Sequence, residues 1–212
     1  EPGVEVRFGG DFSLIVEGSL SANGAENNTI TFTSNKDQPE AGDWNTIVFN
    51  GTELSELTYC VVQYAKNAIT IENSVAKIEN CKITTNFQTG ITLVNSTAEV
   101  KNNEVAYNLE SGIHITGNNQ VTIQKNTIKS NADGILLTGN STSGVSITEN
   151  ILTSNTESGI HLDAGDYSNI SILNNILSAN NNGFYVSGQA STYITNNSVS
   201  YNAIGIFYEK GE

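Results

Sequence analysis

The chain has 212 residues and carries 22 Asp and Glu against 9 Lys and Arg, which gives a formal net charge of −13. This balance argues against nucleic acid binding, because there is no basic stripe to displace the counterions of a phosphate backbone. No run of about 18 apolar residues occurs, so no membrane span is predicted. The length suffices for one domain with a substantial core.

The N-terminal residues already alternate as a strand does, with Val4, Val6 and Phe8 separated by polar residues. Asn, Ser and Thr are abundant and Met is absent, a composition that fits an extracellular or cell-surface repeat protein. We expect the sequence to be a processed piece of a longer precursor.

Residues 34–43 interrupt the strand pattern. They include Lys36, Asp37, Pro39, Glu40 and Gly42, and such turn-forming and charged residues predict an inserted loop. We expect Trp44, which follows, to close this loop against the core.

An apolar column then recurs about every 22 residues to the end of the chain: Ile47, Ile69, Ile91, Ile113, Ile135, Ile160, Phe184 and Ile206. A second apolar column lies two places further on in each repeat, and glycine precedes most members of the first. Self-similarity at a fixed period indicates a stacked repeat. Alternation of period two with short turns indicates strands without helices. The sequence therefore predicts one all-β domain over residues 1–212, a parallel β-helix of three short sheets and about nine turns, here called rungs.

Two asparagine columns follow the same period. The first is Asn103, Asn126, Asn150, Asn175 and Asn197, with Cys60 and Cys81 at its earlier positions; the second is Asn86, Asn108, Asn131, Asn155, Asn180 and Asn202. Asn tolerates positive φ at bends, and stacked amides can bond along the axis, about 4.8 Å per rung. We expect asparagine ladders at the corners of the coil. The two cysteines should be inward neighbours, either as stacked free thiols, which their parallel direction favours, or as a disulfide, which their separation permits.

Three pairs of opposite charge lie 22 residues apart: Lys77 with Glu99, Glu79 with Lys101, and Lys82 with Glu104. In a coil of this period they should be direct neighbours on adjacent rungs, and their attraction would oppose a one-residue slip.

The run Ile-x-x-Asn-x-Ile followed by Asn-x-x-x-Gly-Ile-x-Ile resembles the repeat of right-handed parallel β-helix proteins. The N-terminal segments Pro2-Gly3-Val4, Gly18-Ser19-Leu20, Ile30 to Ser34 and Gly42-Asp43-Trp44 are similar to β-helix segments of large bacterial and archaeal surface proteins. The resemblance implies a right-handed coil. The same fold serves pectate lyases, polygalacturonases, alginate epimerases, phage tailspikes, adhesins and inert surface proteins, so function must be argued from the site.

Asn131-Ala132-Asp133-Gly134 is similar to the Asn-x-Asp-Gly motif of polygalacturonases, which implies Asp133, with Glu157 on the next rung, as catalytic carboxylates. That family's later motifs are missing, since Asn181-Asn182-Gly183 stands where Gly-His-Gly is expected and residues 203–207 hold no base. A polysaccharide-degrading or -modifying enzyme is therefore the alternative hypothesis.

Acidic residues precede the Gly-Ile strand on three successive rungs, at Glu110, Asp133 and Glu157. Oxygen ligands stacked about 4.8 Å apart would suit Ca²⁺; the other interpretation is a solvated turn without metal. No other cofactor is expected.

One outward column becomes aromatic toward the C-terminus: Thr92, His114, Leu136, His161, Tyr185 and Phe207. His114 and His161 lie two rungs apart, too far to share a metal, and are expected as exposed imidazoles. Rings flanked by Asn and acidic groups can stack on sugars, so His114, His161, Tyr185 and Phe207 are the candidate binding residues. The other interpretation is a packing contact with a terminal tail or a neighbouring chain.

Together these patterns predict a non-catalytic structural or adhesive module of the cell surface or secreted space. Its expected partners are a polysaccharide or copies of itself. The first rung near Val4 and the last near Tyr208 would expose strand edges, so we expect either flanking domains or end-to-end stacking.

Overall fold

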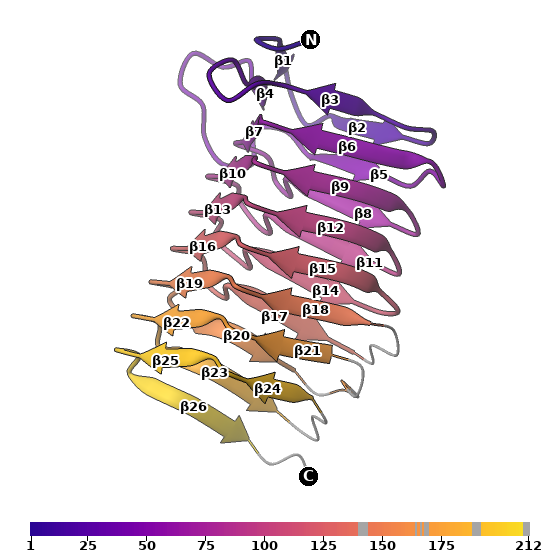
Figure 1. Ribbon diagram of the computed structural model, residues 1–212. Helices are drawn as coiled ribbons and strands as arrows, with labels where there is room; N and C mark the ends of the chain where they lie inside the picture. The colour runs from indigo at the N-terminus through magenta and orange to yellow at the C-terminus, as the bar shows by residue number, and fades with distance from the viewer. Residues whose placement is uncertain (140–143, 164, 166, 168–169, 188–191, 210–212) are drawn as a thin grey trace.

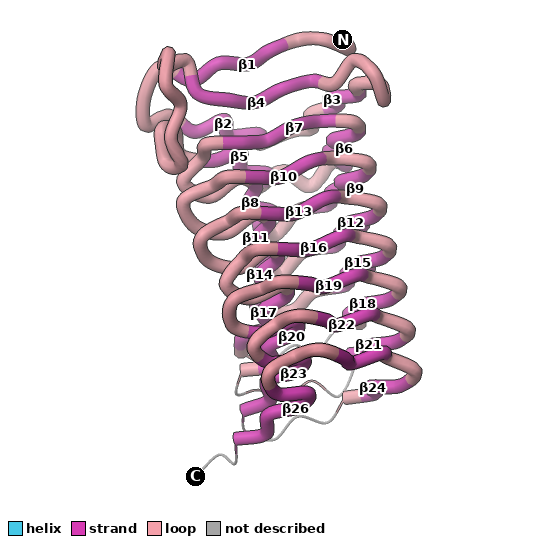
Figure 2. Tube along the Cα trace, turned by 90° about the vertical axis from the view of Figure 1, so that its left-hand side faces the viewer, coloured by secondary structure: helices cyan, strands magenta, loops and turns pink. Residues whose placement is uncertain are grey.

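The computed structural model describes residues 1–139, 144–163, 165, 167, 170–187 and 192–209. Within these residues the chain forms parallel strands arranged as a right-handed coil, without a helix (Figures 1 and 2). Each strand pairs with the strand one rung later, so every third strand belongs to the same sheet. This confirms the predicted fold class, with about the expected number of rungs.

Three parallel sheets form the walls of the coil. Sheet A is β1 (Glu5–Phe8), β4 (Ile30–Ser34), β7 (Cys60–Gln63), β10 (Lys82–Thr84), β13 (Glu104–Ala106), β16 (Thr127–Lys129), β19 (Ile151–Thr153), β22 (Ile176–Ser178) and β25 (Ser198–Ser200). Sheet B is β2 (Ser13–Val16), β5 (Thr46–Phe49), β8 (Ile69–Glu72), β11 (Ile91–Val94), β14 (Ile113–Thr116), β17 (Ile135–Thr138), β20 (Ser158–Leu162), β23 (Asn182–Ser187) and β26 (Ile204–Glu209). Sheet C is β3 (Ser21–Asn23), β6 (Leu54–Thr58), β9 (Val75–Glu79), β12 (Thr97–Lys101), β15 (Gln120–Gln124), β18 (Val145–Thr148), β21 (Ile170–Leu173) and β24 (Tyr193–Thr195).

The predicted apolar column is the spine of the core. Ile69, Ile91 and Ile113 are direct partners on successive strands of sheet B and are fully buried. The burial continues to Phe184, which is 1% exposed, whereas Ile206 on the last described strand is 65% exposed. The burial of each large apolar side chain in this stack stabilises the fold by about 1.5–3 kcal/mol. A one-residue slip would move this whole set to the surface.

The stacked asparagines hydrogen-bond along the coil. In the first column, Asn126 donates from its main-chain NH and from its Nδ2 to Asn150 Oδ1, at 2.9 and 3.0 Å. The same Nδ2 also donates to the carbonyl of Val100 at 2.8 Å. Asn131 repeats the bonding to the next asparagine of the second column, Asn155. Each buried amide therefore satisfies backbone groups that the corner would otherwise leave without partners.

The left-handed backbone at the corners falls on the residue before each ladder asparagine. Lys125, Ser130, Glu149 and Ser154 have φ between 56° and 58°, and the asparagine that follows each of them is not among the positive-φ residues. The expectation that the asparagines themselves take positive φ is therefore wrong. Their role is to bond the backbone, while varied residues accept the left-handed turn at a cost of about 1–2 kcal/mol each.

The charge pairs lie in the predicted register but bond differently. Lys77 is the direct partner of Glu99, and Glu79 of Lys101. Lys77 Nζ nevertheless lies 2.8 Å from Glu79 and Lys101 Nζ lies 3.2 Å from Glu99, both on the same strand. Residues two apart on a strand share a face, so the lysines reach along the strand. Lys82 and Glu104 do pair between rungs, at 3.7 Å.

The segment between β4 and β5 leaves the coil at its N-terminal end (Figure 2). Its anchor is Asp43, whose carboxylate accepts hydrogen bonds from Ser34 Oγ at 2.7 Å and from the NH of Glu40 at 2.9 Å, and which pairs with Lys36 at 2.5 Å. Burial alone would raise the pKa of Asp43, but these bonds and the lysine charge outweigh burial and lower it. Asp43 is therefore a structural carboxylate.

Trp44 closes the same loop against the core. It is fully buried, stacks on Phe8 with ring centroids 4.1 Å apart, and donates from Nε1 to the carbonyl of Gln63 at 2.9 Å.

Cys60 and Cys81 are free, buried thiols on consecutive rungs. The main-chain NH of Cys60 donates to Cys81 Sγ at 3.3 Å, and the NH of Cys81 donates to Asn103 Oδ1 at 2.8 Å. The thiols thus continue the first asparagine ladder toward the N-terminus.

Across the described part of the chain there is no helix of the length and hydrophobicity needed to cross a bilayer.

Candidate functional site

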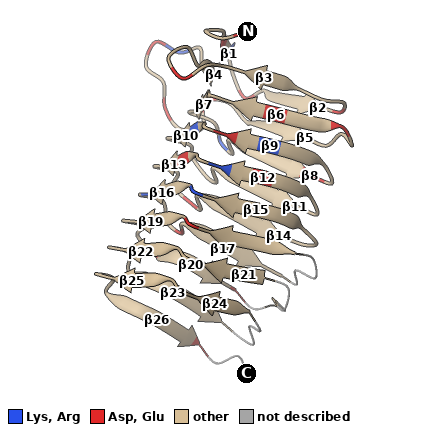
Figure 3. Ribbon diagram, viewed as in Figure 1, with Lys and Arg blue, Asp and Glu red and all other residues tan. Residues whose placement is uncertain are grey.

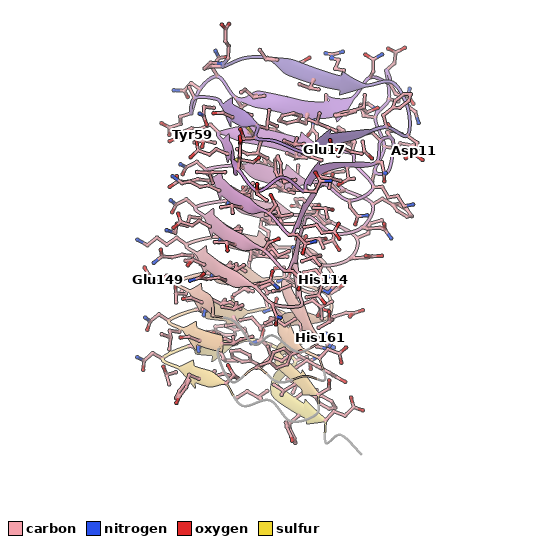
Figure 4. All side chains as sticks on the ribbon, turned by 90° about the vertical axis from the view of Figure 1, so that its right-hand side faces the viewer. Asp11, Glu17, Tyr59, His114, Glu149 and His161 are labelled. Atoms are coloured by element: carbon pink, nitrogen blue, oxygen red, sulfur yellow. The ribbon has the colours of Figure 1, made fainter. Side chains whose placement is uncertain are left out.

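The outward column of sheet B is the surface on which the candidate residues meet. Thr92, His114, Leu136 and His161 are direct partners on successive strands. Tyr185 and Phe207 continue the same line. Figure 4 shows His114 and His161 on one side of the coil, one above the other. The alternation of each strand therefore places these side chains outward while Ile113 and Ile160, beside the histidines in sequence, point into the core.

His161 is paired with a carboxylate from the preceding rung. Its Nδ1 lies 3.0 Å from Oδ2 of Asp133, and Asp133 Oδ1 accepts a hydrogen bond from the NH of Ser158 at 3.1 Å. Asp133 is only 5% exposed. Both carboxylate oxygens are thus engaged, and the imidazole is held in one orientation against the sheet. The expectation of freely exposed imidazoles is wrong for His161.

The same is true of His114, which is half-buried and bonded from Nε2 to Thr138 Oγ1 at 2.8 Å. The two imidazoles have opposite pKa shifts. Burial lowers the pKa of His114, and the charge of Glu110 offsets only part of that effect. Burial also acts to lower the pKa of His161, but the hydrogen bond and charge of Asp133, with the charges of Asp163 and Glu157, raise it overall. His161 therefore retains its proton to higher pH than His114.

Three rings lie in contact beyond Asp133. His161 meets Tyr185 edge-on, with ring centroids 4.5 Å apart at 63°. Tyr185 stacks on Phe207 at 5.2 Å and 22°. We call His161, Tyr185 and Phe207 the ring column. Successive rungs of a parallel sheet are about 4.8 Å apart, so a column of one residue per rung spaces rings at contact distance.

A column of polar residues lies beside the rings, and its first and last members are acidic. Tyr185 Oη donates to the carboxylate of Glu209, which together with burial and the charges of Glu209 and Asp163 raises the pKa of Tyr185. Ser187 Oγ donates to Asp163 Oδ1 at 2.9 Å. We call Asp163, Ser187 and Glu209 the acidic column. The pair of columns presents ring faces next to hydrogen-bond acceptors.

The predicted stack of Glu110, Asp133 and Glu157 does not form. The NH of Ala132 donates to the carbonyl of Glu110, and the NH of Glu157 donates to the carbonyl of Ala132. Ala132 therefore occupies the place in that column that was assigned to Asp133. Asp133 lies one position further on, in line with Ser111 and Ser158.

This offset has consequences for both alternative sites. Within the residues that the structure describes, no group of three or more His, Cys, Asp or Glu side chains is placed to hold a metal ion. Asp133 is buried against His161 while Glu157 belongs to the exposed turn. The two carboxylates are thus not arranged as an equivalent pair on neighbouring rungs, as the polygalacturonase resemblance implied.

Comparison with known proteins gives the family. The family model described as "Right handed beta helix region" matches residues 45–199. The chain belongs to this family. A search among curated proteins returned no significant match.

Solved structures share the fold of this β-helix protein at low identity. An alginate lyase from a Paenibacillus species is 12% identical with a TM-score of 0.50, and the alignment covers 99% of this chain and 92% of that one. The Dettilon tailspike protein is 13% identical with a TM-score of 0.57, and the alignment covers 96% of this chain and 61% of that one. Identities this low establish a common architecture and nothing more.

The charges of the β-helix divide along its length. Residues 130–209 contain six Asp and Glu and no Lys or Arg. In Figure 3 the ribbon positions of Lys and Arg extend from the N-terminal end of the coil to β16, whereas the described rungs beyond β16 carry only positions of Asp and Glu. His161 is the one histidine of this segment.

Proposed function

We propose that this β-helix is a non-catalytic module of the cell surface or secreted space that binds a polysaccharide. The binding surface is the ring column His161, Tyr185 and Phe207 together with the acidic column beside it. The observation that carries the proposal is the continuous stack of three rings on an outer sheet face. The likeness to an alginate lyase supports the proposal, because a coil of this kind there belongs to a protein that acts on a carbohydrate polymer.

The physical basis is complementarity of faces. The face of an aromatic ring carries partial negative charge, and the C–H groups of a pyranose present partial positive charge to it. Carboxylate and hydroxyl oxygens at the ring edge can accept hydrogen bonds from sugar hydroxyls. The rings are supported by a rigid sheet, so little conformational entropy is lost when a ligand is bound.

The absence of catalysis in this proposal rests on the state of Asp133. Its two oxygens already accept bonds from His161 and Ser158, so it orients the imidazole instead of facing a substrate. A base acting beside a uronate carboxylate also needs a cationic or Ca²⁺ clamp, and residues 130–209 contain no Lys or Arg to serve as the cationic one.

A binding test can separate the ring column from other exposed rings. Tyr185→Ala should weaken binding to a polysaccharide that the wild type binds by at least tenfold, which is about 1.4 kcal/mol of binding free energy. Affinity electrophoresis or calorimetry measures the change. Tyr201→Ala is the matched control, because Tyr201 is 93% exposed and lies between β25 and β26. Equal effects of the two substitutions would contradict the proposed face.

The enzyme alternative is tested in the same samples. The proposal predicts that acidic and neutral polysaccharides are recovered unchanged after incubation. Release of reducing ends or unsaturated products that disappears in Asp133→Ala would instead establish catalysis.

A second candidate role is end-to-end assembly of copies of this chain. Ile194, Ile206 and Tyr208 belong to core columns, yet they are 37%, 65% and 59% exposed on the last described rung. At the other end, Leu14 and Val16 begin the column that Ile206 and Tyr208 finish. Parallel strands at both ends would allow a second copy to continue all three sheets.

Sedimentation velocity should then show concentration-dependent growth of larger species, and Ile206→Glu should abolish this growth. Ile151→Glu, on an outward position of sheet A, is the control for added charge.

A further inference from the structure

The loop between β4 and β5 forms a small cleft with the first turns of the coil. Asp11, Ala41, Gly42, Lys66 and Phe87 line a cavity of about 360 Å³. These residues come from turns of the first, third and fourth rungs and from the end of the loop. Figure 4 shows Asp11 at the periphery of the coil, near its N-terminal end. The volume lies in the range of small-molecule sites, which is about 300–1,000 Å³.

The wall that the loop supplies is held in place by the backbone. The NH of Gly42 donates to the carbonyls of Tyr64 and Ala65, both at 3.1 Å, and the NH of Asp43 donates to the carbonyl of Tyr64 at 3.0 Å. A Cβ added at Gly42 would lie 3.3 Å from Phe87 Cβ, so the loop backbone lies directly against the base of the ring. The cleft is therefore preformed, and binding would order little of the chain.

The base in the cleft differs from the other bases of the chain. The described ranges hold eight Lys and Arg, because Lys210 is the one of nine that falls outside them. Seven of the eight pair with a carboxylate at 3.7 Å or less. Lys66 is the exception, since its ammonium has no ion pair with any described carboxylate. The carboxylate of Asp11 likewise has no ion pair or side-chain hydrogen bond among the described residues.

The charges outside the described ranges belong to distant parts of the chain, and they are Asp166, Lys210 and Glu212. The nearest described residues in sequence are Tyr167 on the seventh rung and Glu209 on the ninth. These rungs lie about 19 Å and about 29 Å along the axis from the rung of Lys66, at about 4.8 Å per rung. One to three residues and a side chain do not span such distances. The two charges of the cleft are thus available to a ligand.

The lining favours one kind of ligand over another. Its two polar side chains carry opposite charges, and the remaining members are apolar, with the ring of Phe87 49% exposed. A sugar carries several hydroxyl groups, and most of them would find no side-chain partner here. A molecule with an apolar body and one charge of each sign finds a partner for every group. Such a molecule has no net charge, so the net charge of −13 does not oppose its approach.

We propose that this cleft binds a small zwitterion with an apolar side chain, which is the chemistry of an apolar amino acid or a short apolar peptide. Lys66 binds the carboxylate, Asp11 binds the ammonium, and Phe87 contacts the apolar side chain. The inference goes beyond the polysaccharide proposal and does not depend on it, because the cleft lies on the first four rungs and the ring column on the last three.

The test uses ligands that lack one group at a time. Leucine carries all three groups, N-acetylleucine lacks the ammonium, leucinamide lacks the carboxylate, and glycine lacks the apolar side chain. Nuclear magnetic resonance titration, followed on the amide signals of Gly42 and Lys66, should show each analogue binding about tenfold or more weakly than leucine. Leucyl-leucine holds its two charges further apart, so its affinity relative to leucine distinguishes a peptide from a free amino acid.

Two substitutions assign the charges to their residues. Lys66→Gln should bring leucine and leucinamide within about threefold of one another, and Asp11→Asn should do the same for leucine and N-acetylleucine. Both residues are exposed, so the fold should be retained. Lys101→Gln is the matched control, because Lys101 is a base of sheet C that pairs with Glu99 at 3.2 Å. It should leave every affinity unchanged.

The possible results decide the inference without involving the ring column. Absence of binding by both leucine and leucyl-leucine would overturn it, as would affinities that neither Lys66→Gln nor Asp11→Asn alters. Tighter binding of glucuronate than of leucine, lost in Lys66→Gln, would also overturn it, because the cleft would then take an acidic sugar. The polysaccharide proposal fails or stands separately, on the effect of Tyr185→Ala.

Discussion

At the residue scale, the pairing of Asp133 with His161 shows how a turn can adjust a neighbouring rung. Asp133 lies in the residue position before Gly134, and its carboxylate reaches the imidazole on β20. The column that places His161 also contains His114, which has no such partner and has the opposite pKa shift. The two histidines therefore form an internal comparison for the effect of one buried carboxylate.

We expect nuclear magnetic resonance titration to give His161 the higher pKa and His114 the lower. Asp133→Asn should lower the pKa of His161 and leave that of His114 nearly unchanged. Because the folded-state pKa of His161 is raised, its stabilising contribution is complete below about pH 6.5 and is lost as pH rises through the folded value. Denaturant unfolding across that window should show the loss in the wild type and a flatter profile in Asp133→Asn. A His161 pKa below that of His114 would contradict the assignment.

The ladder asparagines make a second residue-scale prediction. Asn150 accepts from Asn126 and donates to Asn175 and to the carbonyl of Ile123. Asn150→Ala would leave several buried groups unsatisfied, at about 1–3 kcal/mol each, so the free energy of unfolding should fall by about 3 kcal/mol or more. Asn181→Ala, an exposed asparagine next to the second ladder, should change it by less than about 0.5 kcal/mol. Similar losses at both positions would mean that the ladder bonds contribute little.

At the element scale, the glycine column controls how closely successive strands and ladders approach. A Cβ on Gly112 would lie 2.7 Å from Ile128 Cγ2 and 2.8 Å from the carbonyl oxygen of Gly134. The same crowding recurs at Gly134 and Gly159. The strands of sheet B therefore begin where a side chain would push adjoining rungs apart.

Gly112→Ala should lower the free energy of unfolding by about 2 kcal/mol or more, because a backbone oxygen cannot move aside as a side chain can. Gly144→Ala is the matched control, since a Cβ there meets nothing within 4 Å. Chemical denaturation of the two variants decides the point. Equal stability would show that the rungs have room to separate.

The element scale also explains which parts of the structure could be predicted from the sequence. Column periodicity predicted the strand partners of Ile69, Ile91 and Ile113, because a buried face tolerates no slip. The contact of Asp133 with His161 escaped prediction because the turns differ in length. Four residue steps separate Asn108 from Gly112, whereas three separate Asn131 from Gly134. Counting from the asparagine misplaces Asp133 by one position, and counting back from the glycine places it correctly.

At the scale of the whole molecule, the net charge opposes the end-to-end association proposed above. In the proposed assembly, Ile206 and Tyr208 on the last described rung would supply apolar contact, while a net charge of −13 opposes the approach of copies. Charge repulsion reaches about 30 Å at 0.01 M salt but only about 3 Å at 1 M, because dissolved ions screen it. Apolar contact is not weakened by salt.

End-to-end association should therefore increase with ionic strength. Sedimentation velocity between about 0.01 and 1 M salt should show growth of the larger species, and Ile206→Glu should remain monomeric throughout. A wild type that stays monomeric in high salt at high concentration would remove the basis for assembly.

The paired thiols at the N-terminal end of the ladder give the coil a natural chemical reporter. Cys60 and Cys81 are sealed inside, and hydrogen bonding to Cys60 together with burial raises the pKa of Cys81. An alkylating reagent can reach a reactive thiolate there only while neighbouring rungs are parted. The rate of alkylation therefore reports how often the N-terminal half of the coil opens locally, without any engineered probe. A ligand or a second copy that stabilises the coil against such opening would slow the alkylation.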